Sequence, residues 1–257
     1  VPGNYTKPYG HLTGVRKTYA GMIAAMDEAV GQIVAVLEEK GMRDNTLIIF
    51  SSDNGGPSPG KVTDNGSLRA GKGTIYEGGV RVCAFACWPG KIPAGKVVKE
   101  PFHIVDWYPT LLKLAGGSLQ QKLPLDGKDV WPTIAQGRPS PHSEILLNTA
   151  PTTGAIRVGN WKLVLNGQVA ALEGEDGSAA ATARKGKKAG KKKTADSAEL
   201  FNLADDPYEK TNLASSQPEK LKELRARYEA LARQAVPPKS EAAAPGFKAP
   251  AVWGELP

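Results

Sequence analysis

The feature that most constrains the fold is an apolar run that ends in an acid, an amide and two glycines. Residues 47–56 read Leu-Ile-Ile-Phe-Ser-Ser-Asp-Asn-Gly-Gly. A short, continuously apolar run of this kind is typical of a buried strand. The side-chain oxygens of Asp53 and Asn54 would then lie at the end of a sheet, where the two glycines let the backbone turn sharply. The sequence therefore predicts a binding site at that strand end.

The first 138 residues predict alternating helices and strands. An amphipathic helix is expected over residues 18–40, a strand over 46–52, a second strand over 80–88, and a helix over 107–115 whose N-cap is Asp106. The helix stripe consists of Met22, Ile23, Met26, Val30, Ile33, Val34 and Leu37. This order predicts the α/β class, and the Gly/Pro-rich loop over 55–73 is of the kind that builds sites at sheet ends.

From about residue 139 the pattern changes to short strands. They are expected at 144–147, 155–158, 161–165 and 199–201, with a tight turn at Gly159-Asn160. A last helix is expected from Ser216 to about residue 236. We predict a small antiparallel sheet with one helix over 139–238, and an irregular tail over 239–257.

The net charge of +7 comes from one tract. Seven basic residues lie within 184–193, and the other 26 balance 26 acidic ones. We expect residues 174–197 to form a disordered Lys-rich insert. The alternative is a tether for polyanions, but no specific nucleic-acid partner is expected.

Neither a membrane span nor a leader peptide is expected. No uninterrupted apolar run approaches the roughly 18 residues that a span requires, and residues 1–5 lack a basic segment followed by an apolar one. Cys83 and Cys87 would lie about 13 Å apart on one strand, too far for a disulfide. We expect both to be buried free thiols.

Seven separated segments match one family pattern in order: residues 19–31, 52–56, 72–81, 103–111, 125–131, 159–163 and 200–213. On these segments the chain resembles the C-terminal half of a type I sulfatase, nearest to the arylsulfatase B (N-acetylgalactosamine-4-sulfatase) branch. The resemblance implies the later part of an alkaline-phosphatase-like α/β domain, followed by a smaller subdomain with an antiparallel sheet and a helix. It also implies a calcium-dependent sulfuric ester hydrolase that acts on sulfated glycans, in a periplasmic or secreted parent protein.

The resemblance assigns roles to three residues. Asp53 and Asn54 would be calcium ligands, and Lys72 would contact a sulfate oxygen and stabilise the transition state. The alternative for the first two is an ordinary Asp-Asn-Gly-Gly turn, and for Lys72 a solvated surface lysine. Glu77 and Arg81 are expected to shape the loop rather than to perform chemistry.

Other parts of the family's machinery are not found in this sequence. The family makes its formylglycine nucleophile from Cys or Ser in a Cys/Ser-x-Pro-x-Arg motif, and neither Cys83 nor Cys87 begins one. Ser216 begins Ser-Gln-Pro-Glu-Lys, which fits a helix start better. The family's early paired aspartates and catalytic histidines are also missing. We therefore expect the isolated chain to be inactive.

Three histidines and two rival functions complete the sequence-based expectations. His103 is expected to be structural, and His11 and His142 to be exposed. The first rival is another alkaline-phosphatase-superfamily hydrolase, a phosphodiesterase or phosphonate hydrolase. The second is a non-catalytic polyanion-binding protein that uses the Lys-rich insert.

Overall fold

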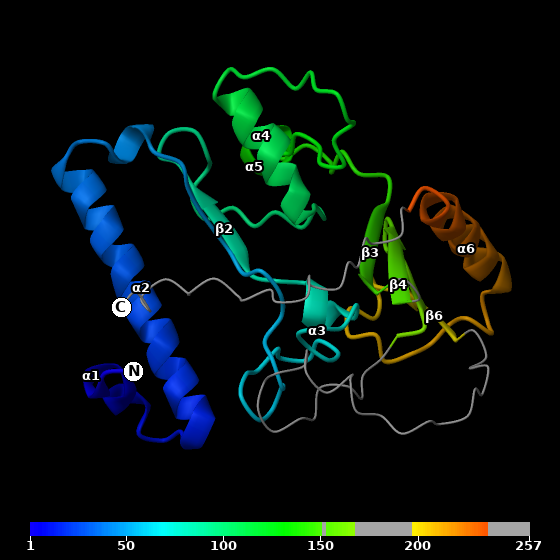
Figure 1. Cartoon of the computed structure of the whole chain (residues 1–257), viewed down its shortest axis with the longest axis horizontal. Coiled ribbons are helices and arrows are strands. Elements are labelled where there is room, and N and C mark those ends of the chain that lie inside the picture. Colours follow the sequence, from blue (N-terminus) through cyan, green and yellow to red (C-terminus); the bar gives the residue numbers. More distant parts are fainter. Residues whose placement is uncertain (151–152, 168–196, 236–257) are drawn as a thin grey trace, which may run out of the picture.

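The computed structural model describes residues 1–150, 153–167 and 197–235. Figure 1 shows two parts, which we call the N-terminal part (residues 1–138) and the C-terminal part (the described residues from 139 to 235). The first contains helices and a two-stranded sheet, and the second contains a four-stranded sheet with one helix. The predicted Lys-rich insert, apart from Ser197, and the predicted tail lie outside the described residues.

The N-terminal part begins with the short helix α1 (Gly3–Thr6) and the long helix α2 (Gly14–Glu39). α2 starts four residues earlier than predicted and packs against α1 and the 3₁₀ turns that flank it. It is also long and apolar enough to cross a membrane, although polar residues interrupt its apolar ones. Because core helices and signal sequences satisfy the same criteria, this finding concerns length and composition only.

The two-stranded sheet pairs β1 (Ile48–Ser51) with β2 (Ala84–Cys87) in antiparallel register. Phe50 lies opposite Phe85, and their rings stack at 4.9 Å between centroids. β1 is half-buried rather than buried, and β2 is shorter than predicted. Residues Glu77–Val80, which precede β2, form a helical turn, α3, because the Arg81 amide donates to the Glu77 carbonyl at 2.8 Å.

Two helices, α4 (Trp107–Leu114) and α5 (Trp131–Gln136), follow β2 in the chain. Asp106 is the N-cap residue of α4, as predicted, but its side chain makes no capping hydrogen bond to that helix. Its buried carboxylate instead accepts hydrogen bonds from the amides of His103 and Lys128 and contacts His142 Nε2 at 2.8 Å. His142 is therefore not exposed as expected, since only 7% of its side chain reaches solvent.

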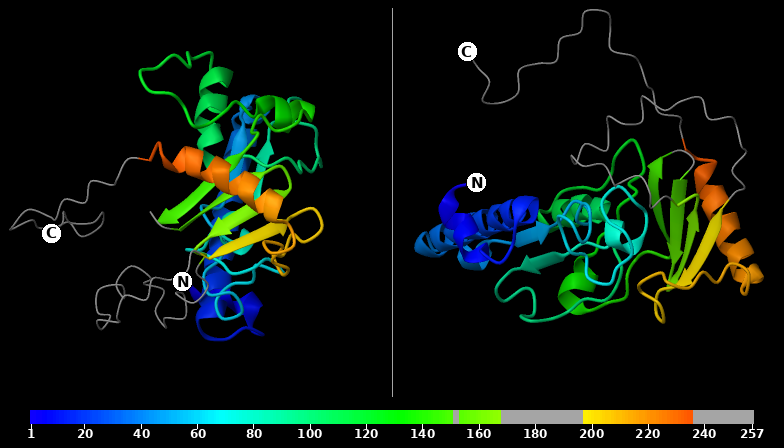
Figure 2. Two further views of the ribbon diagram at one scale, coloured as in Figure 1. Left: turned by 90° about the vertical axis from the view of Figure 1, so that its right-hand side faces the viewer. Right: turned by 90° about the horizontal axis from the view of Figure 1, so that it is seen from below.

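The C-terminal sheet has the antiparallel order β3-β4-β5-β6 and carries helix α6 (Pro218–Ala232) on one face (Figure 2). The strands are β3 (Ile145–Ala150), β4 (Thr153–Val158), β5 (Trp161–Leu165) and β6 (Ala198–Asn202). Alternate residues point to opposite faces. The face toward α6 buries Ile156, Leu163, Leu200 and Leu224. The other face buries Ala155, Val164 and Phe201 against Ile75 and Tyr76 of the N-terminal part.

The two cysteines are free, as predicted, but both are exposed. The expectation of buried thiols assumed a strand covered on both faces, whereas β2 belongs to a two-stranded sheet and is largely exposed. Cys87 Sγ accepts a hydrogen bond from the Arg43 guanidinium at 2.8 Å.

Candidate functional site

Backbone hydrogen bonds join the two loops that carry the candidate residues. β1 ends at Ser51, so Asp53 and Asn54 begin the first loop. The Gly55 amide donates to the Gly79 carbonyl at 2.9 Å, and the Lys72 amide donates to the Gly56 carbonyl at 3.1 Å. The structure therefore places the backbone of Lys72 beside the residues that follow Asn54.

Glycines allow this close approach of the two loops. A Cβ added to Gly55 would lie 1.7 Å from the Gly78 carbonyl oxygen, and one added to Gly78 would lie 2.2 Å from the Ala70 carbonyl oxygen. Neither position has room for a side chain, because the obstructing atoms belong to the backbone. The Gly-Gly pairs at 55–56 and 78–79 thus pack the two loops together.

Asn65 fastens the same loops and was missed by the sequence analysis. Its Oδ1 accepts from the Gly56 amide at 3.0 Å, and its Nδ2 donates to the carbonyls of Gly56 and Ala70 at 3.2 and 2.9 Å. The Asn65-Gly66 pair lies in the predicted irregular loop, where Asn is common for its local turn-forming bonds. That signal indicates a turn, but it does not reveal a bond to residues nine positions earlier.

The side chains of the three candidates are accessible. Asp53 and Lys72 are exposed and Asn54 is half-buried, and the Asn54 amide donates to the Asp53 carboxylate. Within the described residues, the Lys72 ammonium forms neither a hydrogen bond nor an ion pair. An exposed ammonium of this kind is suited to bind an anion as a point charge.

The donors at this strand end fit calcium in type but supply only part of its shell. Calcium takes about six to eight oxygen ligands from carboxylates, amides, carbonyls and water. Asp53 and Asn54 offer a carboxylate and an amide oxygen. Within the part of the chain that the structure describes, no cluster of three or more His, Cys, Asp or Glu residues could hold a metal. The remaining ligands of such an ion would have to come from elsewhere.

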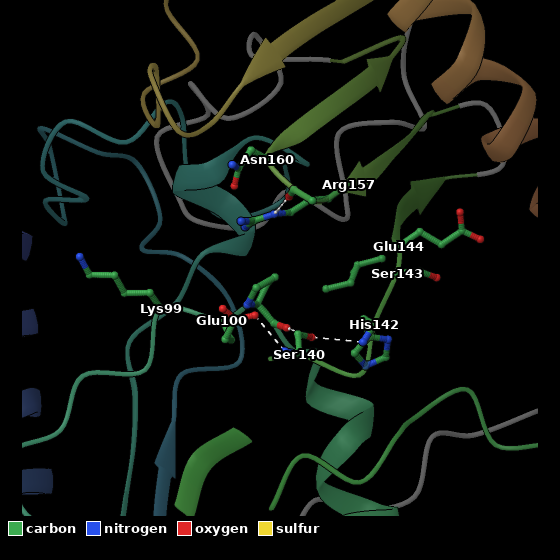
Figure 3. Close-up of a pocket in the computed structure, with 11 residues that line it drawn as sticks. Lys99, Glu100, Ser140, His142, Ser143, Glu144, Arg157 and Asn160 are labelled. Carbon is green, nitrogen blue, oxygen red and sulfur yellow. Dashed lines mark hydrogen bonds between the residues drawn. The ribbon is translucent and has the colours of Figure 1, made fainter. Parts of the chain in front are cut away.

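A separate cavity of about 310 Å³ lies between the two parts of the molecule (Figure 3). It is lined by Arg157 of β4, Asn160 of the β4–β5 turn and His142, and none of the three candidate residues lines it. Burial lowers the pKa of the Arg157 guanidinium. The cavity therefore belongs to the seam between the parts and not to the loops that carry Asp53 and Lys72.

Two family models match the chain in sequence. The model described as Sulfatase matches residues 2–118, and the one described as the C-terminal region of aryl-sulfatase matches residues 140–245. Among curated proteins, arylsulfatase J of Mus musculus is 35% identical over 99% of this chain and 47% of its own length. N-acetylgalactosamine-6-sulfatase of Mus musculus is 35% identical over 58% of this chain and 29% of its own length.

Solved structures agree with these matches. The crystal structure of Ps i-CgsB, also solved in complex with k-i-k-neocarrahexaose, has a TM-score of 0.73 and 31% identity and covers 90% of this chain and 46% of its own. A phosphonate monoester hydrolase of Agrobacterium radiobacter, with a TM-score of 0.56 and 23% identity over 85% of this chain and 41% of its own, shares the fold alone.

The comparisons thus confirm the predicted fold and family, but they do not single out the arylsulfatase B branch. The chain spans about half the length of arylsulfatase J and of Ps i-CgsB, and under a third of N-acetylgalactosamine-6-sulfatase. Both family models and the structural neighbours converge on one conclusion: this chain belongs to the sulfatase family.

Proposed function

We propose that this chain is the C-terminal portion of a calcium-dependent sulfuric ester hydrolase. Asp53 and Asn54 bind calcium, and Lys72 binds a sulfate oxygen of the substrate. The observation that carries this proposal is the joining of the two loops by the Gly55–Gly79 and Lys72–Gly56 backbone bonds. These bonds hold the backbone of Lys72, whose side chain is exposed, next to the two residues that follow Asn54.

The chemistry of ester cleavage explains why such residues belong together. The sulfate carries negative charge that must be neutralised while a nucleophile attacks sulfur, and a hard cation bound at the site supplies part of that neutralisation. Lys72 holds its positive charge on an exposed stem between two glycines, so its ammonium can reach a sulfate oxygen. Asp53 and Asn54 lie two and three residues beyond the end of β1, and a nearby strand end limits their movement.

The substrate class we propose is a sulfated glycan. The support is the 31% identity to Ps i-CgsB, whose structure was solved with an oligosaccharide, and the 35% identity to N-acetylgalactosamine-6-sulfatase. A periplasmic or secreted location of the whole protein is part of the same proposal.

We also propose that further sulfatase sequence completes the active site. This chain spans 47% of arylsulfatase J and contains no Cys/Ser-x-Pro-x-Arg motif. The outward face of α2 supports the proposal, since large exposed apolar patches mark interaction surfaces. Its apolar side chains that are more than 40% exposed are Val15, Met22, Ile23, Met26, Ile33 and Val36. The remainder of an α/β domain would cover this face.

A calcium titration of the 257-residue chain tests the ligand assignment. We expect weak binding in calorimetry that Asp53→Ala abolishes, whereas Asp27→Ala, which removes an exposed carboxylate of α2, leaves it unchanged. We further expect no turnover of an arylsulfate. Calcium binding that is unaffected by Asp53→Ala would refute the metal site, and turnover by the pure chain that Asp53→Ala removes would show that no further segment is needed.

A further inference from the structure

We propose that Lys162, on β5 of the C-terminal sheet, is a positioning residue for the loop that carries Lys72. The proposal rests on the function proposed for Lys72, but the structural link that it describes can be tested separately. It assigns to the C-terminal part a task beyond packing, which is to hold the sulfate-binding loop in place.

The first observation is a buried ion triad between the two parts of the molecule. Lys162 Nζ lies 2.8 Å from Glu77 Oε1 and 2.8 Å from Glu209 Oε1. The Lys162 and Glu209 side chains are fully buried, and only 4% of the Glu77 side chain is exposed. Charges are buried in proteins when they are paired, because an unpaired buried charge is strongly destabilising. The triad therefore fixes Glu77, the first residue of α3, against β5.

Glu209 strengthens this link through the backbone. Its Oε2 accepts a hydrogen bond from the Glu77 amide at 2.6 Å, so one carboxylate contacts both Lys162 and the start of α3. Glu209 also has a φ of 54°, in the left-handed region that non-glycine residues seldom adopt. Such backbone strain persists only where surrounding contacts maintain it, and it is concentrated at functional sites.

A second set of contacts holds the other end of the same loop. Arg69 forms an ion pair with Glu199 of β6 at 2.9 Å and donates to the Glu209 carbonyl at 3.3 Å. Its guanidinium lies 3.9 Å from the centre of the Tyr76 ring, and the Tyr76 hydroxyl donates to the Glu199 carboxylate. The loop is thus anchored to the C-terminal sheet on both sides of Lys72, which is itself exposed.

Backbone bonds transmit this anchoring to the candidate calcium ligands. The Gly78 amide donates to the Arg69 carbonyl at 2.8 Å, which closes the base of the loop. Gly79, the next residue, accepts from Gly55, the residue after Asn54. A shift of α3 away from Lys162 would therefore move both Lys72 and the strand end that carries Asp53.

Hydrogen–deuterium exchange of the 257-residue chain tests the link without any ligand. Lys162→Met should speed exchange of peptides that cover residues 71–79 by about tenfold or more, because loss of a buried ion partner makes local opening of the loop more favourable. The matched control is Leu224→Ala, which removes a fully buried side chain on the α6 face of the same sheet. It should destabilise the sheet while leaving this loop protected at temperatures where both variants remain folded.

A second measurement connects the link to the site. The affinity for inorganic sulfate, in the presence of calcium, should fall about tenfold in Lys162→Met and change little in Leu224→Ala. Loss of sulfate binding in Lys72→Ala would support the proposed function. Unchanged sulfate binding in Lys72→Ala would refute that function, and the exchange experiment would still decide the role of Lys162. If Lys162→Met does not fold, Lys162→Met/Glu77→Gln/Glu209→Gln neutralises both buried carboxylates that lose their partner and carries the same test. Equal exchange in Lys162→Met and Leu224→Ala would overturn the positioning role.

Discussion

Helix α2 and strand β5 differ sharply in how much of their apolar surface they bury. α2 has 26 residues, of which only Gly21 is buried, whereas four of the five residues of β5 are buried. The two elements are comparable in composition, since both are rich in apolar residues. The difference shows that the C-terminal sheet is covered on both faces, by α6 on one and by Ile75 and Tyr76 on the other, while α2 presents apolar surface that the described residues do not cover.

The seam between the N-terminal and C-terminal parts contains both apolar contacts and buried ion pairs. The face of the sheet opposite α6 buries Val164 and Phe201 against Ile75 and Tyr76, and the same face carries the Lys162 triad. Apolar packing and a buried ion triad therefore lie side by side at this seam. Ile75 and Tyr76 of the N-terminal part are thus buried against the C-terminal sheet, whereas Thr110 and Val130 are buried where α4 meets the segment before α5.

Removal of the buried ammonium should have the largest effect on stability. Lys162→Met leaves the Glu77 and Glu209 carboxylates without their shared partner, and we expect a loss of about 3–5 kcal/mol in urea unfolding. Lys113→Met, which breaks an ion pair with Asp129 whose lysine is 62% exposed, should cost less than about 1 kcal/mol. Similar losses for the two variants would mean that the buried Lys162 triad contributes no more to stability than the exposed Lys113–Asp129 pair.

Truncation of apolar side chains should have the next largest effect on stability, and the effect should differ between the C-terminal core and helix α2. Leu224→Ala in the α6 face of the sheet should cost about 2–5 kcal/mol, because it opens a cavity in a closed core. Met26→Ala on the exposed face of α2 should change stability by no more than about 0.5 kcal/mol. A large loss for Met26→Ala, measured by thermal or urea unfolding, would show that α2 is covered in solution.

The smallest expected effect is that of pH on the free energy of unfolding, and it should have opposite signs at Glu209 in the C-terminal part and at His103 in the N-terminal part. Burial raises the pKa of Glu209 above its usual 4.5, so its stabilising contribution is present below pH 4.5 and is lost as the pH rises through the folded-state value. Burial lowers the pKa of His103 below its usual 6.5, so its contribution is present above pH 6.5 and is lost as the pH falls through the folded-state value.

Single variants isolate these two titrations. Glu209→Gln should remove the decline of stability with rising pH, and His103→Asn, which keeps a side chain able to cap the following 3₁₀ turn, should remove the decline with falling pH. The measurement is urea unfolding at a series of pH values from 4 to 8. Identical pH profiles for the two variants and the unaltered chain would contradict both assignments.

Local patterns in the sequence predicted the elements well where the periodicity was strong. β5 has the predicted bounds, α4 differs by one residue at its end, and the Gly159-Asn160 turn joins two paired strands. The strand expected at 80–88 was partly wrong, because the Gly-Gly pair before it packs against another loop and forms α3 instead. The side-chain assignments for Asp106 and His142 were wrong because the two residues bind each other across 36 positions of sequence.

In the candidate site, too, local motifs were predictable from the sequence and contacts between distant residues were not. The sequence named Asp53, Asn54 and Lys72 through motifs, and their roles stay predictions. It did not indicate Asn65, Lys162 or Glu209, since a polar residue in a turn or strand carries no local mark of a distant partner. Lys162 in particular lies within a strand of otherwise apolar and aromatic residues, where only the facing Glu77 and Glu209 explain its burial.

The sequence by itself determined the order and type of most elements, the family, and the chemical character of the two loops, because these depend on periodicity and short motifs. The tertiary structure decided which loops meet, which apolar faces are buried and which charges are paired. These outcomes depend on contacts between residues far apart in the chain, and the free energy of such contacts is fixed only when both partners are in place.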